Sequence, residues 1–103
     1  MEIQYQVKSN SLTLYIRGEL DECSASNAKK YIDKIIMDNL NTDKVIFDLS
    51  GLSFMDSTGI GLLIGRYKKL KLLQIPIYIC NPSLHIEKIF KMTGLYEIMP
   101  KIS

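Results

Sequence analysis

The sequence has little cysteine and almost no net charge. Its 103 residues include only two cysteines and carry a formal net charge of +2. Cys23 and Cys80 lie far apart without metal-ligand spacing, so we expect two reduced thiols of a reducing compartment. So small a charge does not indicate a nucleic-acid partner, and we interpret the basic cluster from Arg66 to Lys71 as the exposed side of a helix.

Long apolar segments are also missing. The most apolar helical stretch, Ile60 to Ile64, is followed too soon by Arg66 to cross a bilayer. The chain opens on Glu2-Ile3-Gln4-Tyr5, without the basic and apolar regions of a signal peptide. We therefore expect a cytoplasmic protein with no membrane partner, and its length predicts one domain spanning residues 1–103.

Two alternating patterns at the start of the chain predict a β-hairpin. Apolar residues alternate with glutamines over residues 3–7, and the alternation returns over residues 12–16. Ser9-Asn10-Ser11 between them has the composition of a turn. We expect Gly18 to end the second strand and residues 19–21 to lead away from it.

The next part of the chain predicts a helix and a buried strand. From about Ser24 the apolar period becomes helical, with a stripe of Ala28, Ile32, Ile35 and Ile36 that ends near Asn39 and Asn41. Val45-Ile46-Phe47 is a short continuous apolar run, which favours a central strand covered on both faces. We interpret residues 48–56 as the loop that follows it.

A second helix should begin near Ser57, with an inward stripe of Ile60, Leu63, Ile64, Tyr67 and Leu70. Pro76 precedes another strand over residues 77–80. Asn81 and Pro82 then suit the cap and the first position of a third helix, and Gly94 can end it. Residues 95–102 form a short tail, either strand or helix.

This order of elements predicts an α/β fold. Strand-helix-strand crossovers place neighbouring strands parallel, whereas the opening hairpin is antiparallel. The expected architecture is one mixed sheet with helices packed on it.

One segment combines hydroxyls, a carboxylate and glycines at the predicted start of the second helix. It runs Met55-Asp56-Ser57-Thr58-Gly59-Ile60-Gly61, after a central strand, where ligands of sheet-and-helix folds gather. Asp56, Ser57 and Thr58 are all good helix caps, so capping alone could explain them. The alternative is a hydroxyl that accepts a phosphoryl group, beside bare glycine backbone that a partner could approach closely.

Catalytic patterns are lacking. The single histidine, His85, lies near the start of the third predicted helix, and no nucleophile elbow or phosphate-binding loop is present. Asp48 lies at a strand end, as in two-component receiver domains, but the opening hairpin does not fit that fold. We interpret Asp48 as a turn residue.

The segment from Met55 to Gly61 closely resembles the corresponding segment of the bacterial anti-sigma factor antagonists, small proteins built on the STAS fold. The likeness extends from Gly18-Glu19-Leu20-Asp21 to Met92-Thr93-Gly94-Leu95. It implies a phosphoacceptor at Ser57, although Thr58 is a second candidate hydroxyl. Residues 65–68, Gly-Arg-Tyr-Lys, resemble the sporulation branch more than the general stress branch.

The resemblance implies a partner-switching cycle with no enzymatic activity or cofactor in this chain. The unphosphorylated antagonist would bind an anti-sigma factor, itself a serine kinase that carries the nucleotide, and so release a sigma factor. Phosphorylation of Ser57 would end binding, and a serine phosphatase would reset it. The partner surface would comprise Asp21, Asp56, Ser57, Thr58, Gly59 and Gly61.

Three other interpretations compete with this one. STAS domains also occur as sensor or scaffold subunits of signalling assemblies, and a general stress antagonist would share most of these residues. An enzyme with Ser57 as nucleophile would have only Asp56 or His85 as its base.

Overall fold

The opening hairpin forms as predicted. In the computed structural model, which describes residues 1–102, β1 (Glu2–Lys8) pairs antiparallel with β2 (Ser11–Leu20). Ser9 and Asn10 join the strands with φ angles of 52° and 63°. Positive φ at both positions gives the turn a twist that matches the flanking strands, so two residues suffice to connect them.

Strand β2 continues past Gly18, so the prediction that Gly18 ends it is wrong. Gly18 has a φ of 105° and lies at an irregularity in the strand register. Before this point β2 pairs in parallel with β3 (Lys44–Asp48), and from Gly18 onward it pairs with β4 (Leu52–Met55). A bulge at a glycine bends the strand without ending it, which lets β2 serve two partners.

Strand β4 corrects the prediction of a loop over residues 48–56. Leu52 and Met55 are buried, whereas Ser53 and Phe54 between them are exposed. This short strand leads directly to the start of helix α2 (Ser57–Leu72).

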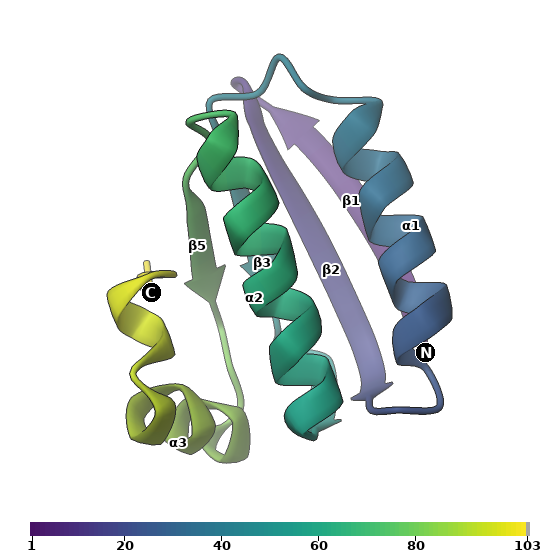
Figure 1. Ribbon diagram of the computed structural model, residues 1–103, viewed down its shortest axis with the longest axis vertical. Coiled ribbons are helices and arrows are strands. Elements are labelled where there is room, and N and C mark those ends of the chain that lie inside the picture. The colour runs from purple at the N-terminus through teal and green to yellow at the C-terminus, as the bar shows by residue number, and fades with distance from the viewer. Residues whose placement is uncertain (103) are drawn as a thin grey trace.

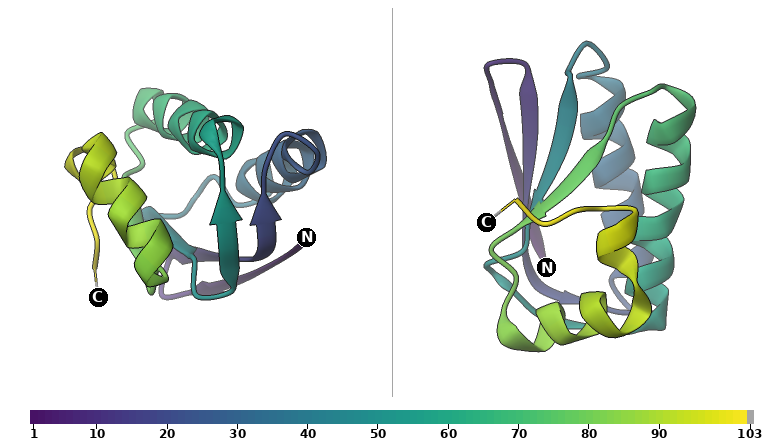
Figure 2. Two further views of the ribbon diagram at one scale, coloured as in Figure 1. Left: turned by 90° about the horizontal axis from the view of Figure 1, so that it is seen from below. Right: turned by 90° about the vertical axis from the view of Figure 1, so that its left-hand side faces the viewer.

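The sheet is mixed, as predicted, with the order β1-β2-β3-β5 and with β5 spanning Ile77–Cys80. All pairings beyond the hairpin are parallel. Helices α1 (Ala25–Met37) and α2 lie on one face (Figures 1 and 2), and none of the helices of residues 1–102 lies on the other. Coverage of Val45-Ile46-Phe47 on both faces is therefore a wrong prediction, and Ile46 is only half-buried.

Helix α3 (Leu84–Thr93) begins later than predicted. Its cap is Ser83, whose hydroxyl accepts from the backbone N–H of Ile86 at 3.3 Å. Asn81 instead has a φ of 55° and donates its side-chain amide to Asp48 at 3.2 Å, which ties the end of β5 to the end of β3. Gly94 ends α3 in the left-handed conformation, as predicted.

The tail contains both of the structures that the sequence left open. Residues Leu95–Glu97 form a short 3-10 helix, and Lys101 then makes a parallel bridge to Ile79 of β5. Figure 2 shows this segment crossing back to the sheet. Its last residue, Ser103, is outside the described residues.

The core lies between the sheet and helices α1 and α2. Its fully buried side chains include Leu14 of β2, Phe47 of β3 and Leu63 of α2. The predicted inward stripe of α2 is fully buried at Leu63 and Leu70 and half-buried at Ile60, Ile64 and Tyr67. Within residues 1–102, no helix is long and apolar enough to span a bilayer.

Arg66 lies on the buried side of α2, so its assignment to the exposed side is wrong. Its side chain is only 9% exposed, and its Nε lies 3.1 Å from a carboxylate oxygen of Asp33 on α1. The Nε and Nη1 atoms make no hydrogen bond to any residue in the described part of the chain. The contact is therefore an ion pair between the two helices, formed at the periphery of the core.

Candidate functional site: the start of helix α2

Asp56 caps helix α2. One oxygen of its carboxylate accepts from the backbone N–H groups of Thr58 at 2.9 Å and Gly59 at 3.0 Å. The free N–H groups of a first helical turn need such an acceptor, and aspartate is among the residues that supply it best. The cap of α2 is therefore Asp56, and the possibility that Ser57 serves as its side-chain cap is ruled out.

Ser57 and Thr58 are the first two residues of α2, and both are exposed. Neither hydroxyl makes a hydrogen bond within residues 1–102. Because Asp56 already binds the N–H groups of this turn, the fold does not use the Ser57 hydroxyl. It is open to modification at the positive end of the helix dipole.

Asp21 shapes the loop that precedes α1. Its carboxylate accepts from the backbone N–H groups of Cys23 and Ser24, each at 3.0 Å. The next residue, Glu22, donates its backbone N–H to the second carboxylate oxygen of Asp56 at 3.2 Å. Asp56 thus joins the starts of both helices, and it brings the Asp21 loop beside Ser57.

The glycines of α2 fall into two kinds. A Cβ atom added to Gly59 would lie 2.4 Å from the carbonyl oxygen of Leu20 and 2.7 Å from Cγ of Met55, so only glycine fits there. A Cβ atom added to Gly61 or Gly65 would meet nothing within 4 Å. Packing against β2 accounts for Gly59, whereas no internal contact accounts for the other two.

The bare glycines line an open groove between α1 and α2. Its volume is about 390 Å³, and the residues around it come from both helices: Ala25, Ser26, Lys29, Thr58, Gly61, Leu62, Gly65 and Arg66. The groove starts at Thr58, so Ser57 lies at its end. Four of the six predicted partner residues, Asp56, Ser57, Thr58 and Gly61, therefore lie at or beside this groove, with Asp21 next to them and Gly59 buried beneath.

Sequence reasoning missed the α1 side of the groove. Ser26 and Lys29 were simply polar positions outside the apolar stripe, and no motif marked them. Only the packing of α1 beside α2 brings them next to Thr58 and Gly61. A weak sequence signal is that apolar residues of α2 are not confined to one stripe: Leu62 lies outside the predicted one and is buried in the structure.

Other polar residues serve the fold. Asp48 accepts from the backbone N–H of Ser50 at 2.9 Å and from its hydroxyl at 2.7 Å, as expected of a turn residue. Burial alone would raise the pKa of Asp48, but hydrogen bonds from Ser50, Asn81 and Cys80 outweigh burial and lower it. Burial, together with the charge of Asp48, raises the pKa of the Cys80 thiol to about 11, so this thiol is unreactive near neutral pH.

His85 does not assemble a catalytic group. Its ring stacks on Phe54, with ring centroids 6.4 Å apart, at the contact of α3 with β4. Within residues 1–102, no group of three or more histidine, cysteine or acidic side chains could hold a metal ion.

Comparison with known proteins identifies a family for nearly the whole chain. The STAS domain family matches residues 2–103. An anti-sigma F factor antagonist of Lysinibacillus sphaericus is 34% identical over 89 residues, which cover 86% of this chain and 75% of the relative.

Solved structures extend the likeness to three dimensions. The anti-sigma factor antagonist SpoIIAA in its unphosphorylated form superposes with a TM-score of 0.79 at 27% identity, over 99% of this chain and 89% of the other. The phosphorylated form of the Bacillus cell fate determinant SpoIIAA superposes with a TM-score of 0.72 at 28% identity, over 99% and 92%.

Proposed function

The chain belongs to the STAS domain family and, within it, to the anti-sigma factor antagonists, and from this premise we propose that it is a switch gated by phosphorylation of Ser57. Unphosphorylated, it binds an anti-sigma factor that is also a serine kinase, and thereby releases a sigma factor. The kinase phosphorylates Ser57 and the complex dissociates. A serine phosphatase then restores the binding form.

The observation that carries this proposal is the spare hydroxyl of Ser57. It is exposed on the first turn of α2, while the neighbouring Asp56 makes the capping hydrogen bonds. A kinase can therefore reach and modify Ser57 without removing a contact that holds the fold. Thr58 is also exposed, but its backbone N–H is held by Asp56 and its side chain lines the groove.

The partner surface extends from the Asp21 loop over Ser57 and along the groove. Asp21 and Asp56 lie at one end of it, where their carboxylates accept backbone N–H groups at the starts of the two helices. Thr58 and Gly61 line the groove with small side chains or none, so partner atoms can approach the α2 backbone there. Gly59 acts indirectly. It lets the start of α2 lie close against the end of β2, and so it fixes the position of the exposed residues next to it.

A phosphate on Ser57 acts on the complex and leaves the fold intact. It adds about −1.5 to −2 charge, next to the carboxylates of Asp56 and Asp21. In the free protein it remains in water near the positive end of α2. In the complex, an unpaired or like charge buried at the interface costs several kcal/mol, and about 1.4 kcal/mol is tenfold in affinity. Binding therefore weakens about a hundredfold or more.

The biological setting follows the relatives. The 34% identical relative antagonises an anti-sigma F factor, so we place the chain in sporulation control rather than in the general stress response. The switch has no catalytic step of its own and operates in the cytoplasm. Phosphorylation of Ser57 would act in the same physical way in sporulation control and in the general stress response.

Mass-spectrometric localisation of phosphate tests the site. The protein is incubated with an anti-sigma serine kinase and ATP, alongside the Ser57→Ala and Thr58→Ala variants. We expect one phosphate, on Ser57, in the unmodified chain and in Thr58→Ala, and none in Ser57→Ala. Phosphate on Thr58, or incorporation into Ser57→Ala, would show that the acceptor is misassigned.

A further inference from the structure

The two edges of the sheet differ in how they are protected. At the β5 edge, the tail of the chain covers the strand: the N–H of Ile79 donates to the carbonyl of Pro100, and the N–H of Ile102 donates to the carbonyl of Ile79, each at 2.9 Å. At the other edge, β1 pairs only with β2 among residues 1–102. A seven-residue edge strand without proline or bulge is an open template for another strand.

The hairpin geometry determines which backbone groups face outward. A two-residue turn closes on a pair that exchanges both hydrogen bonds, here Lys8 with Ser11, and such pairs recur at every second residue. The even-numbered residues of β1 therefore bond to β2. Ile3, Tyr5 and Val7 direct their N–H and C=O groups to the free edge.

The sequence of β1 is self-complementary about Tyr5. It reads Glu-Ile-Gln-Tyr-Gln-Val-Lys from Glu2 to Lys8. When a second copy runs antiparallel with Tyr5 opposite Tyr5, Glu2 faces the partner's Lys8 and Ile3 faces the partner's Val7. Glutamine faces glutamine between them. Every cross-strand pair then joins opposite charges or like chemistry, which is the arrangement that stabilises antiparallel strands.

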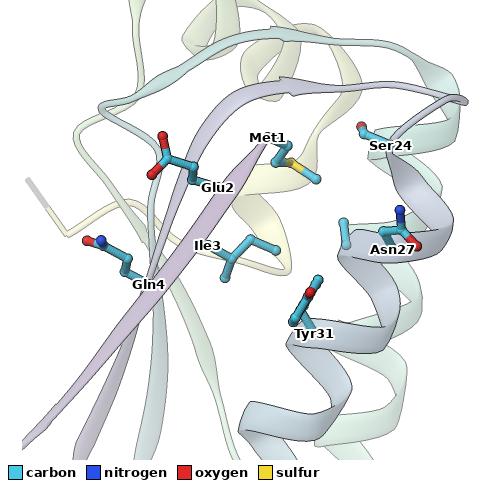
Figure 3. Close-up of a pocket in the computed structure, with 8 residues that line it drawn as sticks. Met1, Glu2, Ile3, Gln4, Ser24, Asn27 and Tyr31 are labelled. Atoms are coloured by element: carbon cyan, nitrogen blue, oxygen red, sulfur yellow. The ribbon is translucent and has the colours of Figure 1, made fainter.

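Apolar side chains are exposed along the same edge. Tyr5 and Val7 are 53% and 47% exposed, and Tyr31 of α1, on the same side of the sheet, is 63% exposed. A groove of about 560 Å³ lies between β1 and α1, bordered by Ile3, Gln4 and Tyr31 (Figure 3). In the pairing centred on Tyr5, the side chain of the partner's Val7 lies beside Ile3 at this groove.

We propose that this protein forms a two-fold symmetric dimer in which the β1 strands of two copies pair antiparallel about Tyr5. The outward groups of Ile3, Tyr5 and Val7 supply the hydrogen bonds, and Glu2 and Lys8 supply two identical ion pairs that fix the register. Symmetry requires this kind of self-complementary patch for a closed dimer. Because the interface is small, we expect a dimer dissociation constant in the micromolar range or above.

The dimer leaves the phosphorylation switch accessible. The groove that holds Thr58 is lined by α1 and α2, whereas the groove beside β1 is lined by β1 and by other residues of α1, Asn27, Ala28 and Tyr31. Each copy can then bind its own anti-sigma factor, and phosphorylation of Ser57 does not change dimerisation. The dimer is thus independent of the proposed switching function.

A charge swap tests the register. Sedimentation of the full chain is measured from about 1 µM to about 1 mM, a range that covers weak self-association. Lys8→Glu places like charges opposite each other at two symmetric positions, and we expect the dimer dissociation constant to rise about tenfold or more. Glu2→Lys combined with Lys8→Glu restores both ion pairs, and we expect recovery to within about threefold.

A backbone variant tests the edge itself. Tyr5→Pro removes an N–H that faces outward, so the hairpin keeps its bonds to β2 while the dimer loses its central pair. Tyr5→Thr keeps that N–H and serves as the control, with thermal unfolding to show that each variant is folded. Loss of dimer in Tyr5→Pro but not in Tyr5→Thr supports the proposal. A chain that stays monomeric throughout, or a dimer insensitive to the charge and proline variants, overturns it.

Discussion

At the scale of single residues, Asp56 and Ser57 divide two tasks between neighbouring positions. The Asp56 carboxylate accepts from three backbone N–H groups, those of Glu22, Thr58 and Gly59. The Ser57 hydroxyl accepts from none in the described part of the chain. One residue therefore stabilises the helix start, and the other can be modified without a structural penalty.

This division predicts opposite results for two alanine variants. Asp56→Ala leaves the first turn of α2 without its cap, and we expect the free energy of unfolding to fall by about 1–2 kcal/mol. Ser57→Ala removes no contact, so its effect stays within about 0.5 kcal/mol. Urea denaturation measures both. Equal losses in the two variants would mean that Ser57 does contribute to the cap.

The glycines of α2 give a second matched set. Gly59→Ala forces a Cβ atom against the carbonyl of Leu20, and we expect a loss of about 1–3 kcal/mol, as for overpacking elsewhere. Gly61→Ala meets open space in a helix interior, and we expect a gain of about 0.5–1 kcal/mol.

The same variants separate folding from binding. If the groove receives the anti-sigma factor, the added methyl group of Gly61→Ala weakens that complex while it stabilises the free protein. Denaturation and binding titration on the same preparation measure the two effects. A stabilised Gly61→Ala that binds as well as the unmodified chain would place the interface elsewhere.

At the scale of elements, an ion pair connects the two helices that form the groove. Arg66 of α2 is buried against Asp33 of α1, and Lys69 lies 4.0 Å from the same carboxylate. These contacts hold the groove walls in place relative to each other. By contrast, the exposed pair of Lys34 and Asp38 lies at the C-terminal end of α1 and joins no other element.

We expect these two ion pairs to differ in energy. Asp33→Ala leaves Arg66 buried without its counter-charge, and the free energy of unfolding should fall by about 1–3 kcal/mol, since Asp33 itself is partly exposed. Asp38→Ala should change it by less than about 0.5 kcal/mol. Asp33→Leu with Arg66→Met should recover most of the loss. Chemical denaturation tests this, and similar values for Asp33→Ala and Asp38→Ala would contradict it.

The elements also show what the sequence could and could not predict. The hairpin and β5 were predictable because strong periodicity and turn residues agreed. Strand β4 was missed because only Leu52 and Met55 are buried in it, without the alternation of a strand. Arg66 was misassigned because its charge suggested water, and only the neighbouring helix reveals the Asp33 partner.

The candidate site was partly predictable for the same reason. Asp56, Ser57 and Thr58 are consecutive, so the sequence alone places them at one helix start. Which of the three side chains caps the helix depends on which oxygen reaches the free N–H groups. Only the three-dimensional structure shows that this oxygen belongs to Asp56. The α1 wall of the groove, with Ser26 and Lys29, comes from tertiary packing that no local pattern encodes.

At the scale of the whole molecule, the fold separates the proposed phosphorylation site from the core that stabilises the protein. The core lies between the sheet and the inner sides of α1 and α2, while Ser57 lies on the surface at one end of α2. Added charge there acts on whatever binds to this end. The family to which the chain belongs, together with this exposed position, supports a switch that works by rejecting its partner rather than by refolding.

The affinity of an anti-sigma factor kinase for the phosphorylated and unphosphorylated protein tests this claim most directly. Both forms are titrated against the kinase without ATP, so that no phosphate is transferred during the titration, in the same buffer and salt. We predict that phosphate on Ser57 raises the dissociation constant about a hundredfold or more, because the charge is rejected at the interface. Dissociation constants that agree within about threefold would contradict the account.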